Sequence, residues 1–217
     1  MTDFSESRTM MVDTQVRPSD VTKFPIIDAM LTVKREAFVP QSKRDVAYVD
    51  ETVDVGEGRY ALDPRSLAKM LDALDVQQDE LVLDIGCGLG YSSAVLARMC
   101  EAVVAVEASK ALADEAQAAL AEQGYDNVAV IDAPLAEGAS KHGPYDIIII
   151  QGGVEQVPQA LCEQLSDGGR IAAIFMNGVL GQCRIGYKSQ DTVTWRMAFN
   201  AGAPVLDGFQ AGTGFKL

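Results

Sequence analysis

Three glycines that follow a short apolar segment are the residues of this chain best suited to hold a small anionic ligand. Gly86, Gly88 and Gly90 come directly after an apolar segment at 81–83, and a helical pattern of apolar residues follows them. A glycine-rich turn lets the backbone bend sharply and approach a ligand without a Cβ in between. The amide groups at the start of the next helix suit a negatively charged group. We therefore expect a nucleotide-type site here, although a plain turn between a strand and a helix gives a similar pattern.

Two carboxylates accompany this turn. Asp84 precedes the glycines, and Glu107 closes the next apolar segment, 17 residues after Gly90. A carboxylate at the end of that strand can accept both ribose hydroxyls of an adenosine ligand. A dinucleotide site requires G-x-G-x-x-G, but the position of its third glycine is Tyr91 here, which argues against NAD. The D-x-G-x-G-x-G pattern with a distant acidic residue instead resembles the S-adenosylmethionine site of Rossmann-like methyltransferases.

The elements that must position these residues alternate between strand and helix. Apolar segments predict strands at 80–84, 102–106, 127–131, 145–151 and 170–175, and helical spacing predicts helices at 91–99, 110–123, 133–140 and 157–166. Segments that are apolar on both faces are typical of a parallel sheet covered by helices. Alternating residues at 181–187 and 192–199 predict an antiparallel hairpin. The expected fold is α/β: a doubly wound, Rossmann-like methyltransferase sheet, mostly parallel, with an antiparallel C-terminal hairpin.

The first part of the chain lacks this regular alternation of strand and helix and is expected to cover the sheet. It predicts a short helix at 8–16, a helix opened by Pro25, short strands at 47–50 and 53–55, and a helix with Asp63 as N-cap and Pro64 in its first turn. No linker or repeat interrupts the sequence. We therefore expect a single domain over 1–217, with an N-terminal cap at 1–75 and a cofactor-binding core with the hairpin at 76–217.

Composition excludes several classes of function. The chain has 217 residues and a net charge of −13, so no basic stripe is available for nucleic acid. No apolar run approaches the roughly 20 residues that span a bilayer, and the first residues do not resemble a signal peptide. Four widely separated cysteines and a single histidine, His142, argue against disulfides and a metal site. We expect a cytoplasmic protein with His142 at the surface.

Blocks along the whole chain resemble, in order, the protein-L-isoaspartate O-methyltransferase family. They are 11–17 (MVDTQVR), 33–40 (VKREAFVP), 47–50 (AYVD), 56–58 (GEG), the glycine turn at 84–91, 106–107, 127–128, 145–146, 158–161, 164–165 and 168–169. The resemblance implies methyl transfer from S-adenosylmethionine to the α-carboxylate of an isoaspartyl residue in a damaged protein or peptide, whose ester then collapses to a succinimide. A carboxylate is already ionised near neutral pH, so this transfer requires positioning rather than a strong base.

The cofactor contacts that the resemblance implies are largely kept. They fall on Asp84, Gly86, Cys87, Gly88, Gly90, Glu107 and Ala108. The family also carries G-D-G after its third strand, whose aspartate lies near the adenine, but the sequence here is Ala133-Pro134-Leu135. Asp132 is a candidate substitute, with a solvated loop carboxylate as the alternative.

The acceptor side departs further from the family. After Gly58 the family has Q-T-I-S-Q-P with an active-site serine, whereas this chain has Arg59-Tyr60-Ala61-Leu62-Asp63-Pro64. Leu62 stands at the serine position and can neither donate nor accept a hydrogen bond. We therefore assign no catalytic residue and consider only the neighbours of Leu62, namely Arg59, Tyr60 and Asp63. By residue type, Arg17, Arg59 and Arg184 are candidates for contact with an anion.

Three functions stay open at this point. The first is isoaspartyl methylation with a rebuilt acceptor site. The second is methyl transfer to another acceptor, with Tyr60 and Leu62 lining a less polar pocket. The third is a non-catalytic role for a methyltransferase-like protein that binds the cofactor or acts through its surface.

Overall fold

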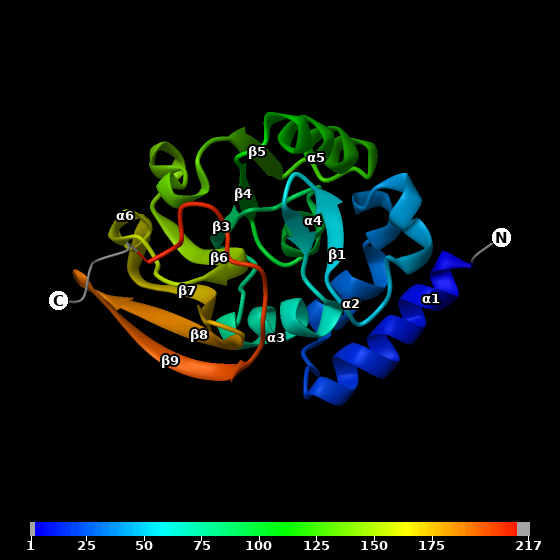
Figure 1. The fold of residues 1–217 in the computed structure, drawn as a ribbon, viewed down its shortest axis with the longest axis horizontal. Helices are drawn as coiled ribbons and strands as arrows, with labels where there is room; N and C mark the ends of the chain where they lie inside the picture. Colours follow the sequence, from blue (N-terminus) through cyan, green and yellow to red (C-terminus); the bar gives the residue numbers. More distant parts are fainter. Residues whose placement is uncertain (1–2, 212–217) are drawn as a thin grey trace.

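A computed structural model describes residues 3–211 and contains a central seven-stranded sheet (Figure 1). The strand order is β5-β4-β3-β6-β7-β8-β9. The strands are β3 (Leu81–Ile85), β4 (Ala102–Glu107), β5 (Val128–Asp132), β6 (Tyr145–Val154), β7 (Leu165–Asn177), β8 (Leu180–Ser189) and β9 (Thr192–Asn200). Strands β3 to β7 are parallel, whereas β8 and β9 are each antiparallel to the preceding strand. The predicted mixed sheet with an antiparallel C-terminal hairpin is confirmed.

Helices and short helical turns cover both faces of the sheet. They are α1 (Phe4–Met11), a π-helical turn η1 (Val12–Val16), η2 (Arg17–Ser19), α2 (Phe24–Thr32), η3 (Arg35–Phe38), η4 (Gln41–Val46), α3 (Pro64–Leu74), α4 (Tyr91–Ala97), α5 (Lys110–Glu122), η5 (Leu135–Glu137), η6 (Ser140–His142) and α6 (Gln159–Glu163). Asp63 caps α3, because its side chain accepts the Ser66 N–H at 2.8 Å, as predicted.

Two apolar cores lie on opposite faces of the sheet, because successive side chains of a strand point to opposite faces. Val82 joins one core, which is formed with apolar side chains of α1 to α5. Leu83 joins the other, which includes residues of η5, α6 and the segment after β9. The apolar stripe of α3, ending at Leu74, is fully buried in the first core. Coverage of both faces explains why the central strands are apolar throughout.

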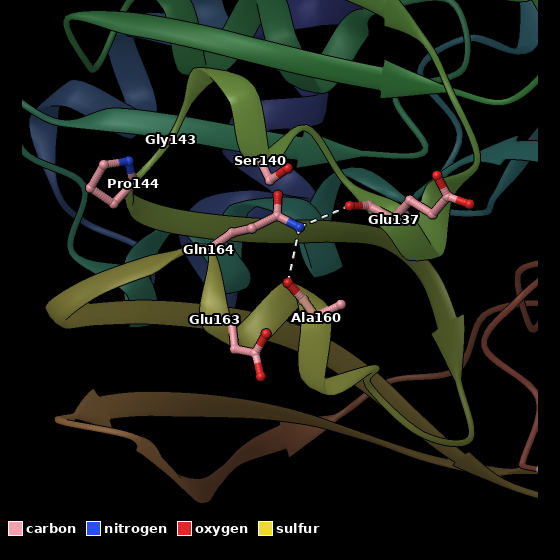
Figure 2. Close-up of a pocket in the computed structure, with 7 residues that line it drawn as sticks. All are labelled: Glu137, Ser140, Gly143, Pro144, Ala160, Glu163 and Gln164. Carbon is pink, nitrogen blue, oxygen red and sulfur yellow. Dashed lines mark hydrogen bonds between the residues drawn. The ribbon is translucent and has the colours of Figure 1, made fainter.

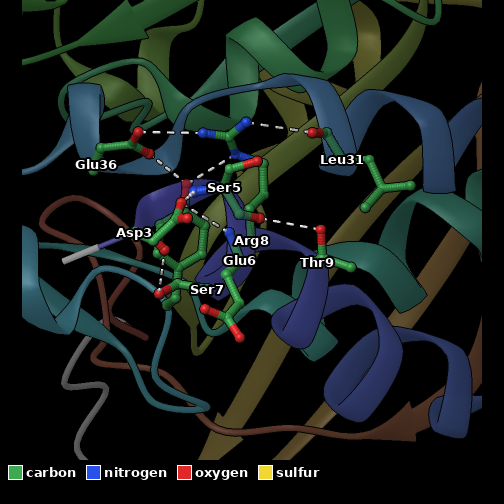
Figure 3. Close-up of polar contacts among 9 residues, drawn as sticks. Asp3, Ser5, Glu6, Ser7, Arg8, Thr9, Leu31 and Glu36 are labelled. Atoms are coloured by element: carbon green, nitrogen blue, oxygen red, sulfur yellow. Dashed lines mark hydrogen bonds and ion pairs between the residues drawn. The ribbon is translucent and has the colours of Figure 1, made fainter.

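One arginine links α1 to the rest of the protein by hydrogen bonds (Figure 3). The Arg8 guanidinium donates to Glu36 at 3.2 Å and to the Leu31 carbonyl at 3.5 Å, and also to the Tyr48 hydroxyl at 3.0 Å. Asp3 caps α1 by accepting backbone N–H groups. These contacts join α1 to α2, to η3 and to the loop that precedes the hairpin of β1 (Val53–Gly56) and β2 (Arg59–Ala61).

Several local predictions were wrong. Residues 47–50 form turns and not a strand, whereas the strand expected at 53–55 is β1 (Val53–Gly56), which pairs with β2 (Arg59–Ala61). The helix expected at 133–140 is replaced by η5 and η6, because Pro134 precedes η5 and Gly138, with φ of +62°, ends it. Helix α6 is shorter than expected, and β7 begins before Gly168, at a register irregularity.

The segment after β9 returns across the sheet to the glycine turn, and no local sequence pattern predicted this path (Figure 1, red). Val205 forms a bridge with Gly153 at the end of β6, while Leu206 and Phe209 are buried in the second core. A Cβ on Gly86 would lie 3.4 Å from a methyl group of Leu206. The C-terminal segment therefore packs directly behind the first turn glycine.

The sequence argues against a membrane span, a metal site and disulfides. No helix within residues 3–211 is long and apolar enough to cross a bilayer. No group of three or more His, Cys, Asp or Glu side chains in this range is arranged to hold a metal ion. The four cysteines are unpaired and buried, and His142 is exposed as expected.

Candidate active site

The polar residues predicted for the site meet at one edge of the sheet, because the carboxyl ends of parallel strands lie together. Asp84 lies in β3, and Glu107 at the end of β4 is opposite Asp132 at the end of β5. Gln151 lies in β6, the other neighbour of β3. Asp84 and Glu107 are fully buried, whereas Asp132 is exposed. The register thus places the candidate substitute carboxylate beside Glu107.

The turn between β3 and α4 needs glycine for backbone conformation and for close approach. Gly86, Gly88 and Gly90 have φ of +76°, +55° and +95°. A Cβ on Gly88 would also lie 3.2 Å from the Val55 side chain, tighter than an ordinary contact. The sharp backbone turn predicted for these glycines is therefore confirmed, and at Gly88 the close neighbour is the β1–β2 hairpin of the chain itself.

Asp84 is held inside a complete hydrogen-bond network. Its carboxylate accepts the hydroxyls of Ser92 and Ser93, each at 2.6 Å, and the Gln151 amide at 2.8 Å. Burial raises the pKa of Asp84, and these hydrogen bonds oppose the rise. Because its partners come from α4 and β6, Asp84 ties the end of β3, where the glycine turn begins, to both elements.

Glu107 forms a buried ion pair at the site. Its carboxylate accepts the backbone N–H groups of Gly88 at 3.1 Å, Ala108 at 2.8 Å and Ser109 at 3.1 Å. It also accepts Nε of Arg59 at 3.0 Å, and the two side chains are only 0% and 7% exposed. Sequence reasoning named both residues but did not pair them, since they are 48 positions apart.

A small cavity lies beside this ion pair. It measures about 20 Å³ and is lined by Tyr60, Ala61, Leu62, Leu67, Gly86, Cys87, Tyr91, Ser92 and Gln151. A volume of this size holds roughly one water molecule. The residues expected on the cofactor side and on the acceptor side therefore share one cavity, with Leu62 as an apolar part of its wall.

A buried arginine that the sequence analysis missed holds this wall in place. Arg35 donates to the carbonyls of Ala47 at 2.6 Å and Leu62 at 2.8 Å, and its guanidinium lies 4.5 Å from the centre of the Tyr91 ring. It is fully buried. Cation–π contact and two hydrogen bonds compensate part of the cost of burying its charge. Arg35 thereby links the turn at Ala47 and the ring of Tyr91 to the Leu62 position.

Four other candidate residues are Cys87, Asp63, Arg17 and Arg184. Burial raises the pKa of the Cys87 thiol well above its ordinary value, so it stays protonated near neutral pH. Asp63 serves as the cap of α3. Arg17 pairs with Asp13 in exposed positions, and Arg184 lies over the Phe175 ring. Of the three arginines proposed for anion contact, Arg59 is the one at the site.

Larger cavities lie away from this site. One of about 590 Å³ borders the start of β6 and is lined by Glu137, Ser140, Gly143, Pro144, Ala160, Glu163 and Gln164 (Figure 2). The Gln164 side chain crosses it and donates to the carbonyls of Glu137 and Ala160. Ligands of doubly wound sheets bind at the carboxyl ends of strands, so this cavity at the amino end of β6 is not the expected site.

The matching family model and two of the most similar relatives carry the same family name. Residues 7–190 match the family model described as protein-L-isoaspartate(D-aspartate) O-methyltransferase. The chain is 40% identical over 170 residues to protein-L-isoaspartate O-methyltransferase 1 of Rhodopseudomonas palustris, which covers 78% of this chain and 69% of that protein. It is 38% identical over 167 residues to a protein of the same family name from Opitutus terrae, with 77% and 72% covered.

Solved structures agree at the level of fold. A protein-L-isoaspartate O-methyltransferase structure superposes with a TM-score of 0.80 at 24% identity, covering 93% of this chain and 66% of the other. A protein of that description from Plasmodium falciparum, solved in complex with S-adenosyl-L-homocysteine, also gives 0.80 at 17% identity, covering 95% and 99%.

Proposed function

The chain belongs to the protein-L-isoaspartate(D-aspartate) O-methyltransferase family, and we propose that it transfers a methyl group from S-adenosylmethionine to the carboxylate of an isoaspartyl residue in a protein or peptide. The observation that carries the proposal is the arrangement at the carboxyl ends of β3 and β4. There Gly88, one of the left-handed glycines of the turn, donates its backbone N–H to Glu107. Homologous sequence over most of the chain supports the same activity.

The residue types of the site fit the cofactor. Glu107 would hold the ribose hydroxyls, Asp132 or Ala108 would lie beside the adenine, and Gly86 and Cys87 would face the amino-acid part. When bound, the cofactor supplies an electrophilic methyl group on a sulfonium. The described conformation has Glu107 paired with Arg59 and a cavity of about 20 Å³, so the residues fit the cofactor but this conformation leaves little room for it.

The work of the chain in this reaction is positioning. An isoaspartyl carboxylate is ionised near neutral pH and needs no strong base. Leu62 and Tyr60 line the cavity and restrict water from it, and Gln151 presents an amide at its edge. Holding a carboxylate oxygen in line with a methyl group lowers the barrier, because a bimolecular step becomes a reaction within one complex.

A second candidate function follows from one observation. Leu62 is buried and lines the cavity at the position where the family has a serine. An apolar wall favours an acceptor less polar than a carboxylate. Methyl transfer to such an acceptor, by the same fold and cofactor, is the alternative.

Labelled-methyl transfer to an isoaspartyl peptide, beside the same peptide with normal aspartate, tests the proposal. We expect transfer selective for the isoaspartyl peptide. We also expect Leu62→Ser to raise it relative to Leu62→Ala, which removes the same apolar group without adding a hydroxyl. Bound cofactor with no transfer to either peptide would remove the repair function and leave the alternative.

Composition and burial support two further parts of the proposal. The net charge of −13 favours a protein substrate over nucleic acid. Four buried, unpaired cysteines fit a reducing compartment, so we propose a cytoplasmic location.

A further inference from the structure

The ion pair between Arg59 and Glu107 occupies the carboxylate that the proposed function assigns to the cofactor. Each oxygen of Glu107 already accepts a hydrogen bond: Arg59, Ala108 and Ser109 donate to Oε1, and Gly88 donates to Oε2. Both side chains are removed from water. A carboxylate that is ion-paired in this way is not free to accept a pair of ribose hydroxyls.

The β1–β2 hairpin that carries Arg59 lies directly on the glycine turn. Val55 is buried and reaches to within 3.2 Å of the Cβ position of Gly88. Tyr60 and Ala61 from the same hairpin line the cavity of about 20 Å³. Small-molecule sites usually enclose several hundred Å³. The hairpin and its arginine thus fill the space at the carboxyl ends of β3 and β4.

The hairpin is built so that it can separate from the domain as a unit. Its two strands form a sheet of their own, distinct from the seven-stranded sheet. Its turn, at Gly56, Glu57 and Gly58, is exposed and has positive φ at all three residues. Movement of the hairpin would therefore break no hydrogen bond of the central sheet, which is what a segment that opens separately requires.

We propose that the β1–β2 hairpin is a strap that holds the cofactor site closed through the Arg59–Glu107 ion pair, and that cofactor binds after this pair separates. The inference rests on the proposed function, because it takes Glu107 as the ribose carboxylate. The apparent dissociation constant of the cofactor is then the intrinsic constant divided by the fraction of open molecules. Removing Arg59 raises that fraction.

Calorimetric titration of the full chain with S-adenosylhomocysteine tests the strap directly. We expect Arg59→Gln, which keeps a polar side chain but removes the charge, to bind at least about tenfold more tightly than the unmodified protein. Arg98→Gln is the matched control, because Arg98 forms a half-exposed ion pair with Asp28 away from the site. It should bind as the unmodified protein does. Arg59→Gln with equal or weaker binding would overturn the proposal.

Two further measurements keep the test independent of how well one variant folds. Val55→Ala loosens the contact of the hairpin with Gly88 without changing the ion pair, and it should also tighten binding. In the unmodified protein, saturating S-adenosylhomocysteine should speed amide hydrogen exchange at residues 53–61. Equal exchange with and without the ligand would mean that the hairpin does not move and would overturn the strap.

The outcome also separates the strap from the proposed function. An Arg59→Gln protein that binds S-adenosylhomocysteine more tightly but methylates no isoaspartyl peptide keeps the strap and removes the repair function. A protein that methylates the peptide and whose affinity is unchanged by Arg59→Gln removes the strap and keeps the function.

Discussion

Replacement of Glu107 by glutamine should cost the protein a large part of its stability. Glu107 is fully buried and accepts hydrogen bonds from Arg59 and from three backbone N–H groups. Glutamine has nearly the same shape but carries no charge and offers one acceptor oxygen instead of two. The change therefore tests the electrostatic and hydrogen-bonding contribution of the carboxylate with little change in packing.

The magnitude follows from the contacts that are lost. If the amide oxygen takes the place of Oε1, the amide NH₂ faces the Gly88 N–H, which is 3.1 Å from the present Oε2. Two donors then oppose each other, and one buried unsatisfied donor costs about 1–3 kcal/mol. The Arg59 guanidinium also loses its charged partner inside the protein. Breaking one side of a buried ion pair costs about 3–5 kcal/mol in total, and we expect Glu107→Gln to fall in this range.

Urea unfolding followed by the fluorescence of Trp195, the single tryptophan, measures the effect. Trp195 packs edge-on against Phe175 at 4.8 Å, so its environment changes on unfolding. Arg59→Gln should cost less, about 1–3 kcal/mol, because Glu107 keeps its three backbone donors. The double variant removes both charges, and its loss should be smaller than the sum of the two single losses by more than about 1 kcal/mol.

Two results would refute this reasoning. A loss below about 1 kcal/mol for Glu107→Gln would mean that the carboxylate is solvated in solution and that the hairpin does not cover it. Losses of the single variants that add within about 0.5 kcal/mol would mean that the two side chains do not interact. The slope of free energy against urea must be equal in all four proteins for either comparison to hold.

Three further predictions concern other buried groups. Burial raises the pKa of Asp84 above its ordinary 3.8, so the folded protein binds this proton more readily than the unfolded chain does. The free energy of unfolding should therefore fall as pH rises through the interval above 3.8. Asp84→Asn should remove this decline, as measured by urea unfolding across the acid range. All four thiols are buried, and burial raises the pKa of Cys100 and Cys183 to about 12. A thiol reagent at neutral pH should therefore react slowly until denaturant is added. One fast thiol in the folded protein would contradict the buried arrangement. Arg35→Lys should lower the free energy of unfolding by about 2–3 kcal/mol. An ammonium group cannot reach two carbonyls and stack on Tyr91 as the planar guanidinium does. An unchanged urea midpoint would contradict this role of Arg35.

The central sheet and the glycine turn could be predicted because their causes are local. The apolar segment at 147–150 has the length and residue types of a buried strand, and the spacing of Gly86, Gly88 and Gly90 reflects a backbone requirement of the turn. Glu107 and Asp132 could be placed near each other because each ends a strand of one parallel sheet, and register then sets them opposite. Gln151, the polar residue directly after that apolar segment, carried the same signal and was overlooked.

The contacts that close the site could not be predicted in this way. The pairing of Arg59 with Glu107 depends on how a short hairpin from the cap meets the glycine turn, and no periodicity of the sequence encodes that approach. Leu206 reaches Gly86 only because the segment after β9 returns across β6.

The prediction of a helix at 133–140 was wrong for a local reason. Pro134 and Gly138 divide this segment, and the apolar spacing alone does not show the division.

Arg59 and Leu62, two of the replacements in the family's acceptor motif, lie on one structural unit. Arg59 begins β2 and Leu62 follows directly after it, so the hairpin that pairs with Glu107 also supplies the apolar wall of the cavity. Arg35 fixes the Leu62 carbonyl, which limits how far this end of the hairpin can move. The hairpin is therefore anchored at its Leu62 end and attached at Arg59 by an ion pair that can separate. Opening would then be a rotation about the anchored end, and Leu62 would stay in place while Tyr60 and Ala61 move with the hairpin and the ribose carboxylate is uncovered.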